Sequence, residues 1–246
     1  MIGAAFSATV YNPIYNGLVY FVGVLPTHDV GIAVIIVTII VRIVLYPLSR
    51  SAIKTQMKMK EVAPELEELK KKLKDKPEEQ SKAIFALYRE RGVKPFSGFL
   101  LILIQLPILL GLYWVFALGG LPEIHSPILY PFVSVPPAVN MEFLGLIDMS
   151  SRSVILAILA AVTQFVYTRL SMGPRGEKTA TEASFSNDMA RSFDLQARYM
   201  LPAMVGVIAY FIAAAAPLYW ITGNLFMIAQ ELATGRRFGT AKKASK

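Results

Sequence analysis

The chain has 246 residues, of which 54% are hydrophobic and 17% charged, and its formal net charge is +8. Soluble domains are on average about half apolar and a quarter charged, so this composition predicts a polytopic, all-α membrane protein. The absence of cysteine excludes disulfides, cysteine-bound metals and a thiol nucleophile.

Residues 1–29 carry no Lys or Arg, so the basic region of a cleavable signal peptide is missing. Apolar runs long enough to cross a hydrocarbon core of ~30 Å occupy residues 30–48, 96–118 and 154–170. The next apolar region is too long for one span, and Pro217 divides it. We therefore expect two further helices at 199–215 and 218–232, which makes five transmembrane helices.

The positions of the cations predict the orientation of these helices. Between residues 49 and 95 there are thirteen Lys and Arg residues, whereas the loop 119–153 has only Arg152. The loop 171–198, which carries both charge signs, contains four Lys and Arg residues, and the tail 233–246 contains five. Because Lys and Arg concentrate in cytoplasmic loops, we expect the N-terminus outside and the C-terminus in the cytoplasm.

The cytoplasmic segment 49–95 reads as a charged helical hairpin. Glutamates follow Pro64 and lysines end that stretch, an order that suits the dipole of a helix beginning at Pro64. A second helix is expected from Pro77 to Gly92. The lysines near the turn between these helices are Lys70, Lys71, Lys72, Lys74 and Lys76.

Arg42 lies inside the first predicted span, one helical turn after Thr38. One interpretation is that Arg42 snorkels to the headgroups and only sets topology. The other is that it faces a water-filled cavity, because the only acidic residue within the spans is Glu231, at the end of the last helix.

Polar and aromatic side chains in the other spans allow the same two interpretations. They are Gln105, Gln164, Tyr219 and Trp220. Each could serve as interhelical contact or, for the two aromatic residues, as part of an interfacial belt. Together they could line one hydrophilic groove around Arg42, open to the cytoplasm.

Three stretches carry a family resemblance: "TIIVRIVLYPLSRSAIKTQMKMKEVAPELEELKKK", "LILIQLPILLGLYWVF" and "APLYWITGNLFMIAQ". They resemble signature segments of the YidC-type membrane protein insertases, the bacterial branch of a group that includes the mitochondrial and chloroplast insertases. The resemblance covers about residues 11–235. We expect this sequence to differ from many members by lacking their large outer domain, and from others by lacking their lipid-attached N-terminus. An interfacial helix around Asn12 to Val24 would stand in the place of these parts.

This resemblance implies an insertase and chaperone for nascent membrane proteins in the bacterial inner membrane, working alone or with the Sec translocon. Arg42, Thr38, Gln105, Tyr219 and Trp220 match groove positions of the family, and the cytoplasmic hairpin matches its substrate-recruiting element. The ribosome, the signal recognition particle and anionic lipids are further expected partners. We expect no cofactor, no metal, no direct DNA binding and no enzymatic activity.

The alternative function is a small anion transporter or channel in which Arg42 binds the anion. It would need a path to the outer face, and no outer half of a span contains a cation. A membrane enzyme is disfavoured because His28 and His125 lie at or beyond the span ends, without the spacing of a catalytic triad or metal site.

Overall fold

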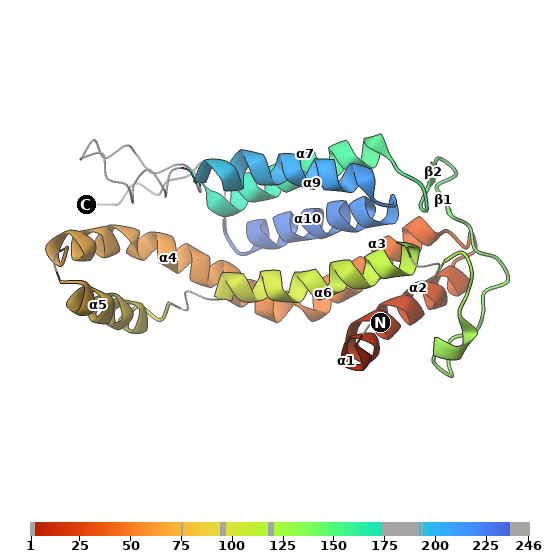
Figure 1. Ribbon diagram of the computed structural model, residues 1–246, viewed down its shortest axis with the longest axis horizontal. Helices are drawn as coiled ribbons and strands as arrows, with labels where there is room; N and C mark the ends of the chain where they lie inside the picture. The colour runs from red at the N-terminus through yellow and green to blue at the C-terminus, as the bar shows by residue number, and fades with distance from the viewer. Residues whose placement is uncertain are drawn as a thin grey trace. The chain divides into compact units, whose positions relative to one another are not determined.

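The computed structural model describes residues 3–74, 76–93, 97–117, 121–173, 192 and 194–236, with side chains of α6 described for 105–116. Helices make up most of the described chain (Figure 1). The chain divides into two units, one formed by residues 1–44 and 107–246 and the other by 45–106.

The first unit begins with a helical N-terminal segment. A short helix α1 (Ala4–Phe6) and a π-helical turn η1 (Ser7–Tyr11) lead into α2 (Asn12–Val24). The bounds of α2 are those predicted for the interfacial helix. One face of α2 is buried against α3 (Val30–Val44), where Leu18, Val19 and Val34 form part of the main apolar core.

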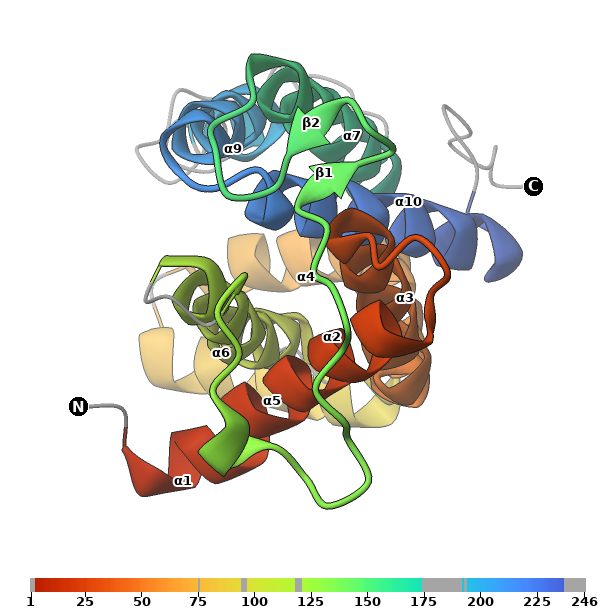
Figure 2. The same ribbon diagram turned by 90° about the vertical axis from the view of Figure 1, so that its right-hand side faces the viewer.

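Three further helices of this unit pack on one another. They are α7 (Val154–Met172), α9 (Leu201–Phe211), which the π-helical turn η3 (Gln196–Met200) precedes, and α10 (Ala215–Ala233). α7 packs against both α9 and α10, and α10 also packs against α3 (Figures 1 and 2). α7 begins where predicted, because the Ser153 hydroxyl accepts a hydrogen bond from the Leu156 N–H at 3.3 Å and caps the helix.

The sequence predicts a break between the last two helices at residues 216–217, but the structure has this break at residues 212–214. α9 ends at Phe211 and α10 begins at Ala215, so Pro217 lies inside the first turn of α10. A proline is tolerated there because the first-turn N–H groups have no acceptor within the helix. The predicted start at Leu218 is therefore three residues late.

Between α6 (Ser97–Ala117) and α7, the described chain forms a loop that contains the 3-10 turn η2 (Ser126–Ile128) and a hairpin of two short antiparallel strands. These strands are β1 (Glu142–Phe143) and β2 (Ile147–Asp148). α2 holds the loop through buried Asn16, which donates to the Ile128 carbonyl at 2.9 Å and accepts from the Tyr130 N–H at 2.6 Å.

The second unit contains α4 (Tyr46–Lys72) and α5 (Pro77–Glu90). The predicted span 30–48 is divided at Leu45, since Pro47 cannot donate to a preceding turn and so falls in the first turn of α4. α4 also runs through Pro64 instead of beginning there. The residues before Pro64 have a buried face that includes Ala52, Ile53 and Val62. Burial of this face favours a helix that begins before Pro64, at Tyr46.

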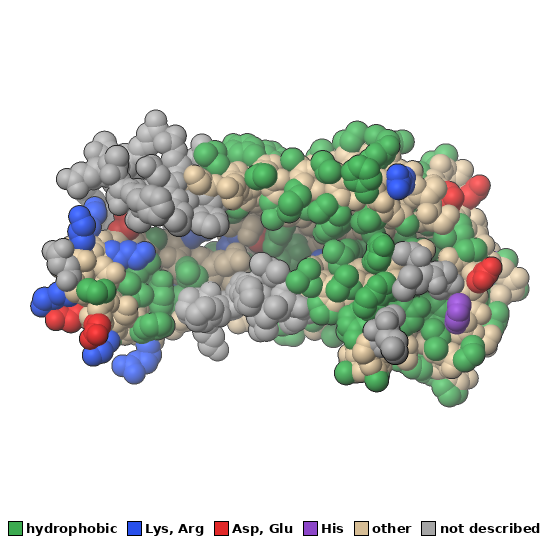
Figure 3. Space-filling view, viewed as in Figure 1, with side chains coloured by type: hydrophobic (Ala, Val, Ile, Leu, Met, Phe, Trp, Pro, Cys, Tyr) green, Lys and Arg blue, Asp and Glu red, His purple; other side chains and the backbone are tan. Residues whose placement is uncertain are grey.

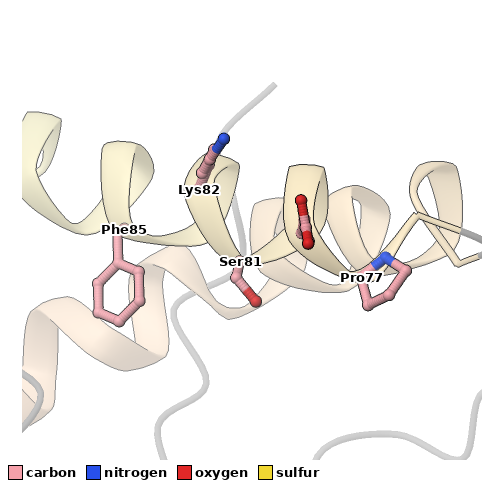
Figure 4. Close-up of a pocket in the computed structure, with 5 residues that line it drawn as sticks. Pro77, Ser81, Lys82 and Phe85 are labelled. Carbon is pink, nitrogen blue, oxygen red and sulfur yellow. The ribbon is translucent and has the colours of Figure 1, made fainter.

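α4 and α5 form the predicted hairpin. Val62, Leu87 and Val93 make a small apolar core, and Gly92 adopts a φ of +60° just after α5 ends. Lys and Arg side chains, with acidic ones among them, gather over this hairpin (Figure 3). α5 also carries a shallow hollow of about 470 Å³ lined by Pro77, Glu78, Ser81, Lys82 and Phe85 (Figure 4).

Helix length and composition test the membrane prediction in part. Within the described residues, α7 is the one helix that is long and apolar enough to cross a membrane by itself. A second span passes this test only when α3 and α4 are taken together, and α6 contributes a shorter apolar stretch, Gln105–Phe116. The mostly helical class is confirmed, and the count of five spans stays a prediction.

Candidate functional site

Arg42 and Thr38 lie one turn apart on α3, as their spacing predicts. Thr38 is buried, and its hydroxyl donates to the Val34 carbonyl of the preceding turn at 2.6 Å. Arg42 is half-buried in the last turn of α3, where the helix carbonyls favour a cation. Thr38 thus satisfies its hydrogen bond within its own helix, whereas Arg42 extends toward a neighbouring one.

The Arg42 guanidinium packs against α10. A Cβ atom placed on Gly223 would lie 2.5 Å from Arg42 Nη2 and 3.2 Å from Nε and Cζ, so the guanidinium occupies the space that a side chain at 223 would take. One turn earlier, the Tyr219 ring centroid lies 6.0 Å from Arg42 Cζ, a distance typical of a cation–π contact. We call Arg42, Tyr219 and Gly223 the arginine site.

The arginine site provides few hydrogen-bond partners for its charge. Among the described residues, buried Arg42 Nε has no hydrogen-bond acceptor, and no carboxylate oxygen lies within 4 Å of the guanidinium. A partly buried cation in this situation requires water or an anionic guest. The arrangement can therefore bind an anionic group without first breaking an ion pair with a described side chain.

Tyr219 and Trp220 are neighbours in sequence, but they face different parts of the first unit. Tyr219 is buried in the main core beside Arg42. Trp220 is half-buried and packs on an apolar cluster that includes Ala160 of α7 and Ala209 of α9. Of the two aromatic residues predicted for the site, the structure places only Tyr219 against Arg42.

α7 and α10 meet along polar faces. On α7, residues 163, 164, 167, 168 and 171 follow helical spacing. Buried Gln164 donates to the Thr168 hydroxyl at 3.3 Å, and Asn224 of α10 donates to the Thr163 hydroxyl at 3.3 Å. The Gln164 bond lies within α7, whereas the Asn224–Thr163 bond joins the two helices across this seam in the manner of an interhelical polar contact.

A second group of charges closes the seam at the end of α7. Arg236 Nη1 donates to the Ser171 carbonyl and, at 3.1 Å, to the carboxylate of Glu231, which is 0% exposed. Arg198 Nη1 donates to the Gly173 carbonyl at 2.6 Å, and its Nε pairs with Asp194 at 2.8 Å. Two arginines thus bind the last carbonyls of α7, where the helix dipole favours cations. We call these residues the end cluster.

Tyr167 connects the two groups of charges. It hydrogen bonds to Ser171 and lies within electrostatic reach of Arg42, Glu231 and Arg236. The arginine site and the end cluster therefore belong to one polar region that α3, α7 and α10 share.

The remaining predicted residues belong to the second unit. Gln105 is half-buried in α6. The predicted recruitment lysines are all exposed, and Lys76 pairs with Glu79 at 3.1 Å. Most of the predicted loop 171–198, and the tail after Arg236, lie outside the described residues.

Sequence reasoning missed three residues of the polar region: Gly223, Tyr167 and Arg236. Gly223 is a small residue inside an apolar helix, and small residues are enriched where membrane helices approach closely. Tyr167 continues the α7 spacing of Thr163. Arg236 was predicted only as one of the basic tail residues, because its contact with Ser171 joins positions 65 residues apart.

The mostly helical fold, with one helix long and apolar enough to cross a membrane among the described residues, is consistent with an all-α membrane protein. Comparison with known proteins specifies which one: the model of the family described as 60Kd inner membrane protein matches residues 22–242. The chain belongs to this family.

Curated relatives agree with this assignment, and each of the following three is named membrane protein insertase YidC. The Clostridium tetani protein is 29% identical over 209 residues, which cover 85% of this chain and 83% of the relative. The Oceanobacillus iheyensis protein is 33% identical over 207 residues, covering 82% and 73%. The Clostridium perfringens protein is 32% identical over 224 residues, covering 89% and 86%. The resemblance predicted from sequence is confirmed.

Proposed function

We propose that this chain inserts nascent membrane proteins into the bacterial inner membrane and that Arg42 supplies a positive charge essential for this activity. The names of the relatives support insertion as the function. The observation that supports the role of Arg42 is its half-buried guanidinium, packed on Gly223 and Tyr219 without a described carboxylate partner.

Arg42 would lie in a hydrophilic groove that opens to the cytoplasm. A partly buried guanidinium is stable only when water or an anion solvates it, so such a groove accounts for the cost of placing arginine in α3. Thr38, Gln164, Tyr219 and Trp220 would line it in the first unit, and Gln105, which lies in the second unit, is proposed as a groove residue from the family resemblance alone.

The topology that fits this groove has five spans, with the N-terminus outside and the C-terminus in the cytoplasm. The spans are α3 with the start of α4, α6, α7, η3 with α9, and α10. This assignment is supported by the cation-free segment 1–29 and by the thirteen cations between residues 49 and 95. It places the end cluster at the cytoplasmic side.

Insertion would proceed by transfer without a covalent step. Arg42 and the water around it would hold the hydrophilic, acidic flank of a substrate, which avoids much of the cost of several kcal/mol for lone polar groups in hydrocarbon. The apolar segment of the substrate would move into lipid along α7 and α10, where each Å² buried contributes about 25 cal/mol. A membrane potential of 100 mV adds about 2.3 kcal/mol for each acidic charge moved outward.

The hairpin of α4 and α5 would recruit the substrate before insertion. Its exposed lysines at positions 70–76 present positive charge to an acidic nascent chain, to anionic lipid or to a ribosome surface. The signal recognition particle and the Sec translocon are further partners in this proposal.

The test is insertion of a single-span protein with an acidic outer tail into liposomes that contain the wild type, Arg42→Ala or Arg42→Lys. We expect protease protection of the tail with the wild type, strong loss with Arg42→Ala, and substantial recovery with Arg42→Lys because the charge is restored. Equal protection by a folded Arg42→Ala variant would refute the role of Arg42. If the wild type inserts nothing but passes small anions, the transporter alternative applies instead.

A further inference from the structure

The tip of the β1–β2 hairpin exposes apolar side chains. Leu144 is 62% exposed and Leu146 is 83% exposed, with Gly145 between them. We call residues 144–146 the hairpin tip. Neither the proposed arginine site nor the charged recruitment hairpin involves this surface.

Leucine is an unfavourable residue for the backbone of this turn. Leu144 has a φ of +54° and Gly145 a φ of +70°, and the Leu146 N–H donates to the Phe143 carbonyl at 3.0 Å to close the turn. Gly, Asn and Asp normally occupy such positions, and the left-handed region costs a leucine about 1 kcal/mol. Because Leu144 is mostly exposed, packing within the described chain provides little compensation.

The hairpin tip is nevertheless held in one position by buried contacts at its base. The Leu144 N–H donates at 2.8 Å to Asp29 Oδ2, while Asp29 Oδ1 accepts from the Ile32 N–H at the start of α3. Asp29 is 2% exposed. The Phe143 ring fills the space beside Gly31, where a Cβ atom would come within 2.3 Å of Phe143 Cδ2. The two leucines therefore project from a fixed base.

The hairpin lies at the end of the helices where their apolar outer surface begins. After β2, the carbonyls of Met149 and Ser151 accept backbone hydrogen bonds from the start of α10. Arg152 Cζ lies 5.8 Å from the Phe211 ring centroid at the end of α9, and the first residue of α7, Val154, is 56% exposed. Figures 1 and 2 show the hairpin beside the starts of α7 and α10.

Tyr210, whose ring packs on that of Phe211, is exposed, and tyrosine is one of the aromatic residues enriched at the boundary between headgroups and hydrocarbon. The hairpin tip adjoins this boundary and contains no charged side chain. We propose that the hairpin tip inserts Leu144 and Leu146 into the lipid leaflet at this end of the helices and so fixes the depth of α3 and α7 in the membrane. The proposed topology makes this the outer leaflet.

Nitroxide labelling tests this proposal directly, because the chain has no native cysteine. Single variants Leu146→Cys and Leu144→Cys are labelled, reconstituted into phosphatidylethanolamine–phosphatidylglycerol vesicles, and measured for collision with oxygen, which enriches in lipid, and with a water-soluble nickel chelate. Glu142→Cys is the matched control, since Glu142 is an exposed acidic residue at the base of the same hairpin.

We expect oxygen collisions to exceed nickel collisions at positions 144 and 146, with the reverse order at 142. Nickel access at 144 and 146 equal to that at 142 would place the tip in water and overturn the proposal. Labels at the tip that neither reagent reaches would also overturn it, because they would show that a protein surface covers the tip. Replacement of an exposed leucine leaves the core intact, and an unchanged melting temperature for each labelled variant verifies this.

Discussion

Substitution of Gly223 by alanine should displace Arg42 without unfolding the protein. The new Cβ would lie 2.5 Å from Arg42 Nη2, whereas ordinary contact begins at 3.4 Å, so the guanidinium has to move by about 0.9 Å. The atom that moves is the end of a flexible side chain, so the cost is small. Alanine also stabilises a helix interior by about 0.5–1 kcal/mol relative to glycine. We therefore expect an unchanged or higher melting temperature.

Insertion should nevertheless slow with Gly223→Ala. If the shift removes one charge-assisted hydrogen bond to the substrate, worth about 1.5 kcal/mol, the rate falls roughly tenfold. The assay is the initial rate of protease protection in proteoliposomes, with Gly17→Ala as control because its Cβ meets Val37 at an ordinary 3.5 Å. Wild-type insertion by Gly223→Ala would refute this reasoning, as would a further loss when Gly223→Ala is added to Arg42→Ala.

Three other predictions concern packing, the end cluster and recruitment. Gly31→Ala should lower the melting temperature markedly, because its Cβ would come within 2.7 Å of three Phe143 atoms. Arg236→Ala should destabilise the protein by about 3–5 kcal/mol, because it leaves the buried Glu231 carboxylate without its arginine. Glu231→Gln should cost less, because it removes the buried charge. Equal melting temperatures for the two variants would contradict this prediction. The recruitment lysines are Lys70, Lys71, Lys72, Lys74 and Lys76. Replacing them by glutamine should weaken substrate association at low salt and leave the melting temperature unchanged. Association equal to that of the wild type would contradict their role.

The sequence predicted the starts of helices best where a single proline or serine residue determines where the helix begins. α5 begins at Pro77 and α7 begins after Ser153, and each boundary depends on chemistry within one turn. Pro217 and Pro64 misled the prediction because proline is compatible with a first turn and, when packing compensates, with a helix interior. The strands β1 and β2 are only two residues long, too short for a periodic pattern.

The candidate site was predictable only in part for a related reason. Arg42 is recognisable from sequence because a cation in an apolar run is costly wherever the helix packs. The role of Gly223 depends on the close approach of α3 and α10, which local pattern does not contain. Tyr219 and Trp220 were predicted as a pair, but successive helix residues point about 100° apart, so only one of them faces Arg42.

The most direct test of the central claim measures coupling between the charge at position 42 and the charge of the substrate flank. Insertion rates would be compared for wild type and Arg42→Gln, each with an acidic and a neutral version of the same single-span substrate. The account predicts that Arg42→Gln slows the acidic substrate much more than the neutral one, because only the acidic flank uses the guanidinium. An equal slowing of both substrates would contradict it and return Arg42 to a role in topology or packing.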